Sequence, residues 1–209
     1  MMTMTPPWLD WVKRLQAISQ NGLTFAKDPF DIERYHAIQE LALEIMAQGV
    51  DTDIDKLRTL FAQEQGYATP KVDIRGVVFR DDALLLVKER SDGRWSLPGG
   101  WADVGESLSD NVVREIYEES GFRTQAVKLL AVYDRSLHDY TPPSRHHIYK
   151  CFFRCDLLGG QATPNIEISD IGFFREHELP ALSLGRTIPQ HVQHMFAHYR
   201  HPEWPTEYD

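Results

Sequence analysis

The sequence has few cysteines and no excess of basic residues. Its 209 residues include two cysteines, and 22 Lys and Arg stand against 31 Asp and Glu, which gives a formal net charge of −9 at pH 7. Cys151 and Cys155 are four residues apart in an expected strand, so they lie roughly 13 Å from each other, too far for a disulfide. Their spacing does not match a zinc site either. We therefore expect reduced, packed thiols, as in an intracellular protein.

Long apolar runs are also missing. No stretch of about 18 apolar residues is present, and the N-terminus has no charged segment followed by an apolar one. Trp8 and Trp11 would suit a helix on a membrane surface, but Asp10 lies between them and no cationic face accompanies them. The acidic balance argues against binding to DNA, because Lys and Arg drive phosphate binding. We expect a soluble, cytoplasmic protein with neither DNA nor a membrane as its partner.

The chain is expected to divide into two domains joined by a linker at residues 67–70. Residues 1–66 predict a helical domain with three helices. The expected boundaries are Thr5 with Pro6 and Pro7 at the start of the first helix and Gly22 at its end, Asp28 and Pro29 at the start of the second and Gly49 at its end, and Asp53 as the cap of the third. We expect this domain to pack on the second domain, 71–209, or across a dimer.

From Lys71 onward the apolar pattern changes to that of strands. Strands are expected from 72, at 84–87, 94–97, 126–133, 147–155 and 171–174, and helices at 107–120 and 186–199. Strands with two helices around them predict a layered sandwich. The expected fold class is α+β: an α/β/α sandwich with a mixed sheet, preceded by a small all-helical domain.

The helix at 107–120 carries an unusual set of carboxylates. Ser107 and Asp110 have the spacing of a capping box, and Gly121 stands where a helix would stop. At about 100° per residue, the apolar stripe consists of Leu108, Val112 and Ile116. The carboxylates fall within an arc of about 100°, close to that stripe. They are Glu115, Glu118 and Glu119.

This placement of three carboxylates is unfavourable unless a cation joins them. Like charges three and four residues apart repel, and the C-terminal end of a helix is the negative end of its dipole. Arg114 can pair with Glu118, but one arginine does not balance three carboxylates. Mg²⁺ or Mn²⁺ would, because these ions prefer oxygen ligands and bridge to phosphates. A solvated acidic helix end is the alternative. Gly99 and Gly100, ahead of the helix, would let the backbone approach phosphate or metal.

The spacing of these residues resembles the Nudix box. Gly100 is followed by Glu106, then by Arg114 and Glu115, by Glu118 and Glu119, and finally by Gly121 and Phe122, each at the offset of the box. The resemblance implies metal-dependent hydrolysis of a pyrophosphate bond in a nucleoside diphosphate linked to another group, X. It makes Glu118 and Glu119 metal ligands and Glu115 a ligand or base. It adds the Gly99 carbonyl as a ligand and gives Glu106 and Arg114 the task of holding loop and helix.

The similarity covers nearly the whole chain and extends well beyond the box. The chain resembles the Nudix subfamily of X-linked nucleoside diphosphate hydrolases in four segments. These are the helical N-terminal segment, 69–75 (TPKVDIR), 97–107 (LPGGWADVGES) and 132–135 (VYDR). CDP-choline and ADP-ribose pyrophosphatases belong to this subfamily. The resemblance implies a homodimer. A catalytically idle nucleotide sensor and a hydrolase of RNA ends are the alternative functions.

Residues outside the box are harder to interpret. Glu167 is the first candidate for a catalytic base and Asp170 the second, since both precede the strand at 171–174, although either would also suit a strand end. Candidate substrate contacts are Arg75, Arg90, Arg135 and His138. The stretch from Arg135 to His147 is rich in Arg and His, but a solvated loop explains it equally well. His191, His194 and His198 share a helix face, and for them an idle surface is the better interpretation.

Overall fold

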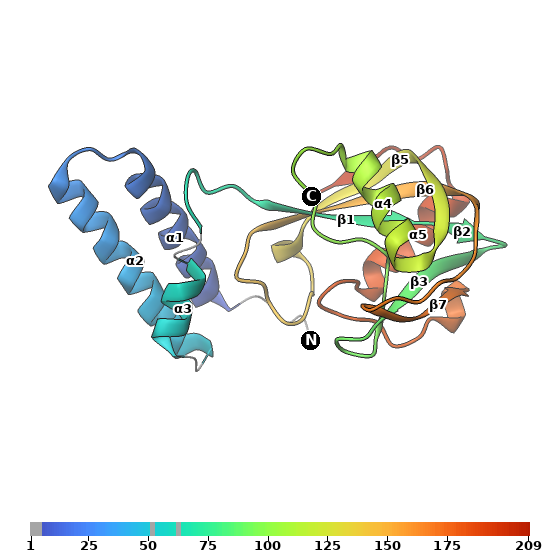
Figure 1. Ribbon diagram of the computed structural model, residues 1–209, viewed down its shortest axis with the longest axis horizontal. Coiled ribbons are helices and arrows are strands. Elements are labelled where there is room, and N and C mark those ends of the chain that lie inside the picture. Colours follow the sequence, from blue (N-terminus) through green and yellow to red (C-terminus); the bar gives the residue numbers. More distant parts are fainter. Residues whose placement is uncertain (1–5, 51–52, 62–63) are drawn as a thin grey trace. The chain divides into compact units, whose positions relative to one another are not determined.

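The protein forms two compact units. The structure, a computed structural model, describes residues 6–50, 53–61 and 64–209, the side chains of 60 and 61 excepted. One unit comprises Met1–Pro70 with Ser144–His147, and the other Lys71–Pro143 with Ile148–Asp209. In Figure 1 the helices of the first unit are blue to cyan, and the second unit extends to red. Within the described ranges, no helix is long and apolar enough to cross a membrane.

The first unit is helical, and its helices begin where the sequence predicts. The helices are α1 (Pro7–Phe25), α2 (Pro29–Val50) and α3 (Ile54–Phe61). The carboxylate of Asp28 accepts a hydrogen bond from the Phe30 amide at 2.9 Å, and that of Asp53 accepts one from the Asp55 amide at 2.8 Å. Both contacts satisfy amides that a helix start leaves unpaired. The expected role of Thr5 lies outside the described residues.

The predicted ends of the first two helices were wrong. α1 continues past Gly22 to Phe25, and α2 continues past Gly49 to Val50. Both glycines serve helix packing instead: a Cβ at Gly22 would lie 2.3 Å from the ring of Tyr35, and one at Gly49 would lie 2.6 Å from the ring of Trp8. A glycine inside a helix therefore marked a place where an aromatic ring packs against the backbone.

The second unit contains two four-stranded sheets. Their strands are β1 (Lys71–Val77), β2 (Phe79–Arg80), β3 (Ala83–Glu89), β4 (Trp95–Ser96), β5 (Phe122–Asp134), β6 (Ile148–Gly160), β7 (Ile168–Phe174) and β8 (Glu207–Tyr208). In the first, the order is β1-β6-β5-β8; in the second, β3 pairs with β2, β4 and β7. β1 runs parallel to β6, and β5 runs antiparallel to it, so the predicted mixed pairing is confirmed. β8 was not predicted.

Helices cover both faces of these strands. α4 (Leu108–Ser120) packs over a core with Ile74, Leu85 and Phe153, and α5 (Pro189–Arg200) over one with Leu84 and Leu86. Successive leucines of β3 thus point to opposite cores, as the alternation of a strand requires. Figure 1 shows α4 in front of the strands. The α/β/α layering predicted from the sequence is confirmed.

Two short 3-10 turns complete the second unit. One, Arg135–Leu137, follows β5, and the other, Glu176–Glu178, follows β7. The cysteines of β6 are both free and buried, as expected from their spacing.

Candidate active site

α4 begins and ends at the residues that the sequence predicts. The Ser107 hydroxyl accepts a hydrogen bond from the Asp110 amide at 3.1 Å. Gly121 ends the helix in the left-handed conformation, with φ 76°. Val112 and Ile116 are fully buried, whereas Leu108 is 36% exposed and does not belong to the buried stripe. Leu108 is the first helical residue, and the buried positions lie one turn further on, so the expected stripe was one position too long.

The three carboxylates of α4 differ strongly in their surroundings. Glu119 is 9% exposed, and its Oε2 accepts a hydrogen bond from the Gly99 amide at 2.8 Å. Burial raises the pKa of Glu119 to about 8, against the opposing effects of Arg75 and the Gly99 amide. Burial also raises the pKa of Glu115, while the side chain of Glu118 is 55% exposed. The site therefore places one carboxylate inside the protein and another at its surface.

Arg114 connects the acidic groups around the helix. Its Nη1 lies 2.9 Å from Glu118 and 3.0 Å from Glu115, and its Nε lies 3.1 Å from Glu106. Its Nη2 contacts Asp103 at 2.6 Å. The hydrogen bond with Glu106 is the largest of the effects that raise the pKa of Arg114. The predicted pairing of Arg114 with Glu118 is thus present, and one guanidinium is shared among four carboxylates.

The loop that contains Gly99 and Gly100 is held against β1. The Gly76 amide donates to the Pro98 carbonyl and the Ile74 amide to the Gly100 carbonyl, each at 2.8 Å. Gly99 has φ 132°, and a Cβ there would lie 2.1 Å from the Ile74 carbonyl oxygen. Only glycine suits such a position. The loop therefore brings backbone groups next to the buried carboxylate of Glu119.

A buried ionic cluster that the sequence reasoning missed lies beneath this loop. Arg75 is 4% exposed and contacts both carboxylate oxygens of Asp73, at 2.9 and 2.8 Å. Its Nη1 donates to the Leu97 carbonyl at 3.0 Å. Lys150 contacts Asp73 from β6 at 2.5 Å. The parallel register of β1 and β6 sets Asp73 opposite Lys150, and this register is not readable from the sequence.

The charged groups in this cluster shift one another's pKa values. Burial lowers the pKa of Lys150 to about 7, and the neighbouring arginines add to this effect against the attraction of Asp73. Although burial alone would raise it, Arg75 and Lys150 hold the pKa of Asp73 below its ordinary value. Arg75, a predicted substrate contact, has its guanidinium directed at Asp73 and the loop. Arg75 therefore lies below the loop of Gly99 and Gly100, which approaches the carboxylates of α4.

Glu89 is a second group that sequence reasoning missed. This buried carboxylate at the end of β3 accepts a hydrogen bond from the Ser96 hydroxyl at 2.8 Å and lies 3.3 Å from Nε of Arg186. Its negative charge contributes to the raised pKa of Glu119. Thr187 supports the same loop, since its hydroxyl accepts from the Leu97 amide at 3.0 Å. In the sequence Glu89 looks like an ordinary charge at a strand end.

The segment with the candidate bases is attached to α4. Asn165 donates from Nδ2 to the Glu118 carbonyl at 2.6 Å, and its Oδ1 accepts from the Glu167 amide at 2.8 Å. Arg90 donates from Nε to the Asn165 carbonyl at 3.0 Å. Glu167 is exposed just before β7, and Asp170 lies within β7. The structure therefore places Glu167 on a segment fixed to the last turn of the helix, and Arg90, which follows β3, is hydrogen-bonded to that segment.

Of the remaining predicted substrate residues, His138 contacts α5, and Arg135 contacts the Gly185 carbonyl in the segment before that helix. Arg135 donates to the Pro142 carbonyl at 2.7 Å, and Nε2 of His138 lies 2.8 Å from the Asp209 carboxylate. The ring of His138 is 4.5 Å from that of His191, a residue of α5. The predicted substrate contacts outside the box thus fall at three places. Arg75 lies below the Gly99 loop, Arg90 contacts the Asn165 segment, and the other two lie near α5.

The expectation of an idle histidine surface on α5 was wrong for two of the three residues, because His191 is 1% exposed and His198 is 2% exposed. Nδ1 of His191 lies 2.8 Å from the Tyr140 hydroxyl, and burial lowers the pKa of His191 to about 3. His194 and His198 each lie 3.4 Å from Glu207. Across the described part of the chain, no three His, Cys, Asp or Glu side chains are already arranged to hold a metal ion. At α4, the guanidinium of Arg114 contacts two of the three carboxylates, so cation binding would require these side chains to turn toward one another.

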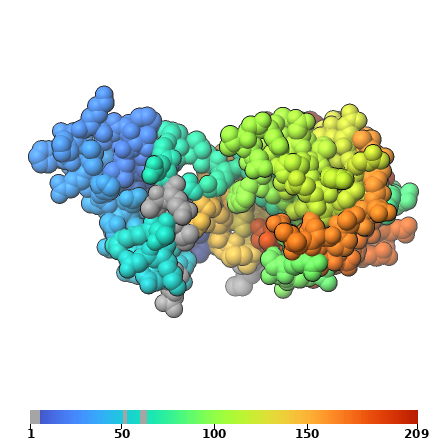
Figure 2. All heavy atoms as spheres, viewed as in Figure 1, coloured from blue at the N-terminus to red at the C-terminus, as the bar shows by residue number. Residues whose placement is uncertain are grey.

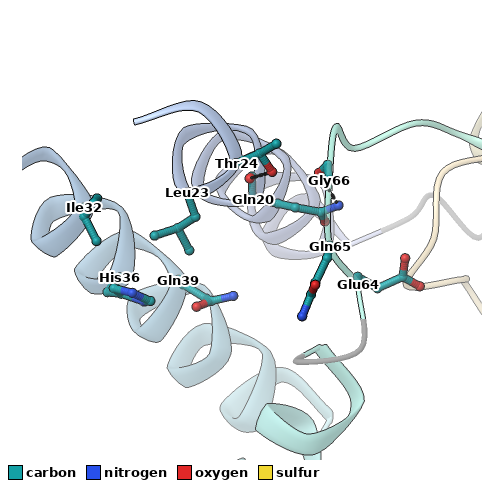
Figure 3. A pocket seen from close by; sticks show the side chains of 9 residues that line it. All are labelled: Gln20, Leu23, Thr24, Ile32, His36, Gln39, Glu64, Gln65 and Gly66. Carbon is teal, nitrogen blue, oxygen red and sulfur yellow. Dashed lines mark hydrogen bonds between the residues drawn. The ribbon is translucent and has the colours of Figure 1, made fainter. Parts of the chain in front are cut away.

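A separate hollow of about 570 Å³ lies in the helical unit (Figure 3). Gln20 spans part of it, with its amide donating to the Gly66 carbonyl at 2.9 Å. The other lining residues are Leu23, Thr24, Ile32, His36, Gln39, Glu64 and Gln65. Among its described lining residues, His36 and Glu64 are the ionisable ones, so these residues supply one carboxylate where α4 supplies three.

The chain is similar to known proteins along nearly its whole length. Residues 69–195 match the family described as the NUDIX domain, and residues 6–61 match the one described as a UDP-X-like, N-terminal oligomerisation domain. The Bacillus subtilis (strain 168) protein YjhB, whose name places it with the ADP-ribose pyrophosphatases, is 43% identical over 209 residues, all of both chains. An ADP-ribose pyrophosphatase of Methanocaldococcus jannaschii is 32% identical over 145 residues, 68% of this chain and 83% of that one.

Two solved structures are similar as well. The crystal structure of a UDP-X diphosphatase is 34% identical, with a TM-score of 0.63, and the match covers 97% of this chain and 98% of that one. The crystal structure of an ADP-ribose pyrophosphatase from Streptococcus suis is 38% identical, with a TM-score of 0.59. The latter match covers 68% of this chain and all of the other.

Proposed function

The chain belongs to the Nudix hydrolase family, and we propose that it hydrolyses the pyrophosphate bond of a nucleoside diphosphate linked to X, of the CDP-choline or ADP-ribose type. The products would be a nucleoside monophosphate and phosphorylated X. The observation that carries this proposal is the complete box on α4, with the buried carboxylate of Glu119 beside the Gly99 loop. Relatives named as ADP-ribose pyrophosphatases and UDP-X diphosphatase support the substrate class.

The carboxylates of α4 are suited to hold divalent cations. Their donor atoms are all oxygens, which Mg²⁺ and Mn²⁺ prefer, and the raised pKa of Glu119 reports a buried carboxylate without a sufficient counter-charge. The proposed ligands are Glu115, Glu118, Glu119 and the Gly99 carbonyl. When bound, such a cation lowers the pKa of a water and neutralises phosphate charge.

The other residues would position the substrate and move a proton. Glu167 is the first candidate for the base that takes the proton of the attacking water, and Asp170 is the second. Arg114 and Glu106 would hold the helix and the preceding loop, through the contacts between them. Gly100 would allow a phosphate to approach the backbone, since its nearest neighbour is the flexible Glu115 side chain.

The proposed substrate contacts outside the box differ in what they can reach. Arg90 is hydrogen-bonded to Asn165, which in turn contacts the Glu118 carbonyl, and Arg90 would contact the substrate there. Arg135 and His138, beside α5, would contact a second part of it. Arg75 would act from below, by fixing the Leu97 carbonyl and thereby the loop.

The helical unit would join two copies of the chain. The description of its family as an oligomerisation domain supports a homodimer. Trp11, Ile18 and Phe25 recur every seven residues along α1, and each is between 53% and 65% exposed. Such an apolar stripe on one helix face is typical of a helix that packs against a partner.

A turnover screen tests the proposed activity. The purified protein is incubated with Mg²⁺ or Mn²⁺ and CDP-choline, ADP-ribose, other nucleoside diphosphate sugars, dinucleoside polyphosphates or nucleoside triphosphates. Glu118→Gln and Glu119→Gln are measured beside it. Metal-dependent release of a nucleoside monophosphate, abolished in both variants, is the expected result. Nucleotide binding without turnover would favour a catalytically idle nucleotide sensor. Salt-sensitive RNA binding with cleavage of RNA ends would favour a hydrolase of RNA ends.

A further inference from the structure

Three of the four consecutive backbone carbonyls in the Gly99 loop are fixed by hydrogen bonds. Those of Pro98 and Gly100 accept from amides of β1, and that of Leu97 accepts from the side chain of Arg75. Within the described ranges, the Gly99 carbonyl has no such donor. It is the carbonyl proposed above as a metal ligand, so its position depends on how firmly the neighbouring carbonyls are held.

The guanidinium of Arg75 reaches this loop with one nitrogen, while Asp73 holds the other two. Nε and Nη2 of Arg75 contact the two carboxylate oxygens of Asp73 at 2.9 and 2.8 Å. Nη1 donates to the Leu97 carbonyl at 3.0 Å. A fork of this kind fixes the plane of a guanidinium as well as its position. The direction in which Nη1 points is therefore set by Asp73.

Lys150 completes the cluster from the neighbouring strand. Its Nζ lies 2.5 Å from Oδ1 of Asp73, the oxygen that also accepts from Nε of Arg75. Asp73 is 7% exposed and Lys150 is 1% exposed, so water competes little for these contacts. Figure 2 shows atoms of α4, in yellow-green, at the surface of the molecule, whereas this cluster is covered. The charged groups are thus held rigidly beneath the loop.

A purely stabilising role does not explain this cluster. Removing charged groups from water is costly, and apolar residues of similar volume often give the same stability as a buried ion cluster. Apolar residues could not, however, direct a guanidinium at the Leu97 carbonyl. Groups that hold metal ligands in place change metal affinity by about 10–100-fold when they are replaced. The contacts of the cluster are those of such a support.

We propose that Asp73 and Lys150 are positioning residues for the proposed metal site. They orient the guanidinium of Arg75, which holds the Leu97 carbonyl and thereby fixes Gly99 next to the carboxylates of α4. The inference rests on the proposed metal-dependent function. It adds to the site two residues of β1 and β6 that lie outside the box and touch neither the metal nor the substrate.

Arg75→Lys tests this proposal and keeps the positive charge beneath the loop. A lysine lacks the planar fork, so it loses the geometry that joins Asp73 to the Leu97 carbonyl. Binding of Mn²⁺ without nucleotide is followed by the EPR signal of the free ion, and its dissociation constant should rise about tenfold. Arg154→Lys is the matched control, because Arg154 also pairs with an aspartate two positions away on a strand, Asp156 at 3.3 Å, but at the surface. This control should change the constant less than about twofold.

A paired substitution perturbs Arg75 through its partners alone. Asp73→Asn combined with Lys150→Gln removes one charge of each sign, and the asparagine offers one acceptor oxygen where the carboxylate offers two. The titrations are made at pH 6.5, where Lys150 is largely protonated because burial lowers its pKa to about 7. The pair should weaken Mn²⁺ binding about tenfold. Lys150→Gln alone keeps the fork and should not weaken it, since the loss of a positive charge favours a cation.

Hydrogen exchange at the Nε–H of Arg75, followed by NMR in the wild-type protein, requires no substitution. Saturation with Mg²⁺ should slow this exchange severalfold, because coupling between the cation and the loop is reciprocal. This measurement decides if thermal melting in EDTA shows that Arg75→Lys and the paired variant do not fold.

Three results would overturn the inference and leave the hydrolase function intact. They are an unchanged Mn²⁺ affinity in either folded variant, an equal loss of affinity in Lys150→Gln and in the paired variant, and an exchange rate at Arg75 that Mg²⁺ does not alter. Absence of Mn²⁺ binding by the wild type would instead refute the proposed metal-dependent function, and the inference with it.

Discussion

The buried charge of Glu119 should make the metal-free protein less stable as the pH rises. The carboxyl is protonated in both folded and unfolded protein below its ordinary pKa of 4.5, so burial has no penalty there. Between that value and about 8 the unfolded chain loses the proton while the folded one retains it, and the penalty grows. Above about 8 both states are charged and the penalty is constant.

Replacing Glu119 by glutamine should remove this penalty. Each unit of pKa shift corresponds to about 1.4 kcal/mol, so the move from 4.5 to about 8 sets an upper limit of roughly 5 kcal/mol. The glutamine carbonyl can still accept the hydrogen bond of the Gly99 amide, but its NH₂ group needs an acceptor that the carboxylate did not. We therefore expect a gain on the order of 2–4 kcal/mol above pH 8 and little gain near pH 5.

Urea denaturation in EDTA between pH 5 and pH 9 measures this difference. Glu118→Gln is the control, because the Glu118 side chain is 55% exposed and its replacement should give a difference that changes little with pH. Adding Mg²⁺ should stabilise the wild type more than Glu119→Gln, since the cation would bind the charged carboxylate. A difference between Glu119→Gln and the wild type that stays flat across this pH range would refute the reasoning.

Two further predictions concern the loop and the buried lysine. Gly99→Ala should destabilise the protein by on the order of 3 kcal/mol, because the new Cβ would lie 2.1 Å from the Ile74 carbonyl oxygen. Gly100→Ala should destabilise it less, because the new Cβ would lie 3.3 Å from a flexible side chain. Thermal melting compares the two variants, and equal melting temperatures would contradict the prediction. The Cε resonance of Lys150, followed by NMR with ¹³C-labelled lysine, should titrate near pH 7 because burial disfavours its charge, and a midpoint near 10.5 would show that Asp73 compensates fully.

The course of α4 was predictable because its signals are local. Ser107 and Gly121 mark its ends through contacts with residues three and four positions away. The spacing of the carboxylates along the helix is also a local property, so the candidate site could be located before any fold was known. The same reasoning failed at Gly22 and Gly49, because a glycine that ends a helix and one that receives an aromatic ring look identical in a sequence.

The support of the site could not be predicted, because it depends on distant residues. Asp73 meets Lys150 through the pairing of β1 with β6, across 77 positions of sequence. Asn165 reaches the Glu118 carbonyl across 47 positions. Neither residue type is unusual for its place in the sequence, and strand register is set by packing rather than by a local signal. The chemistry of the site is therefore local, and the groups that hold it in place are not.

The short strand β8 also bears on how the protein behaves at high concentration. Glu207 and Tyr208 pair with Ala131 and Val132 of β5. In the sheet order β1-β6-β5-β8, β5 would be the edge strand without β8. An uncovered strand at that position would present free amides and carbonyls to a second molecule, and such edges promote aggregation. Two residues of β8, with the Tyr133 hydroxyl donating to Glu207 at 2.6 Å, cover part of that edge. Changes near residue 207 therefore bear on solubility, even though they are far in sequence from the catalytic helix.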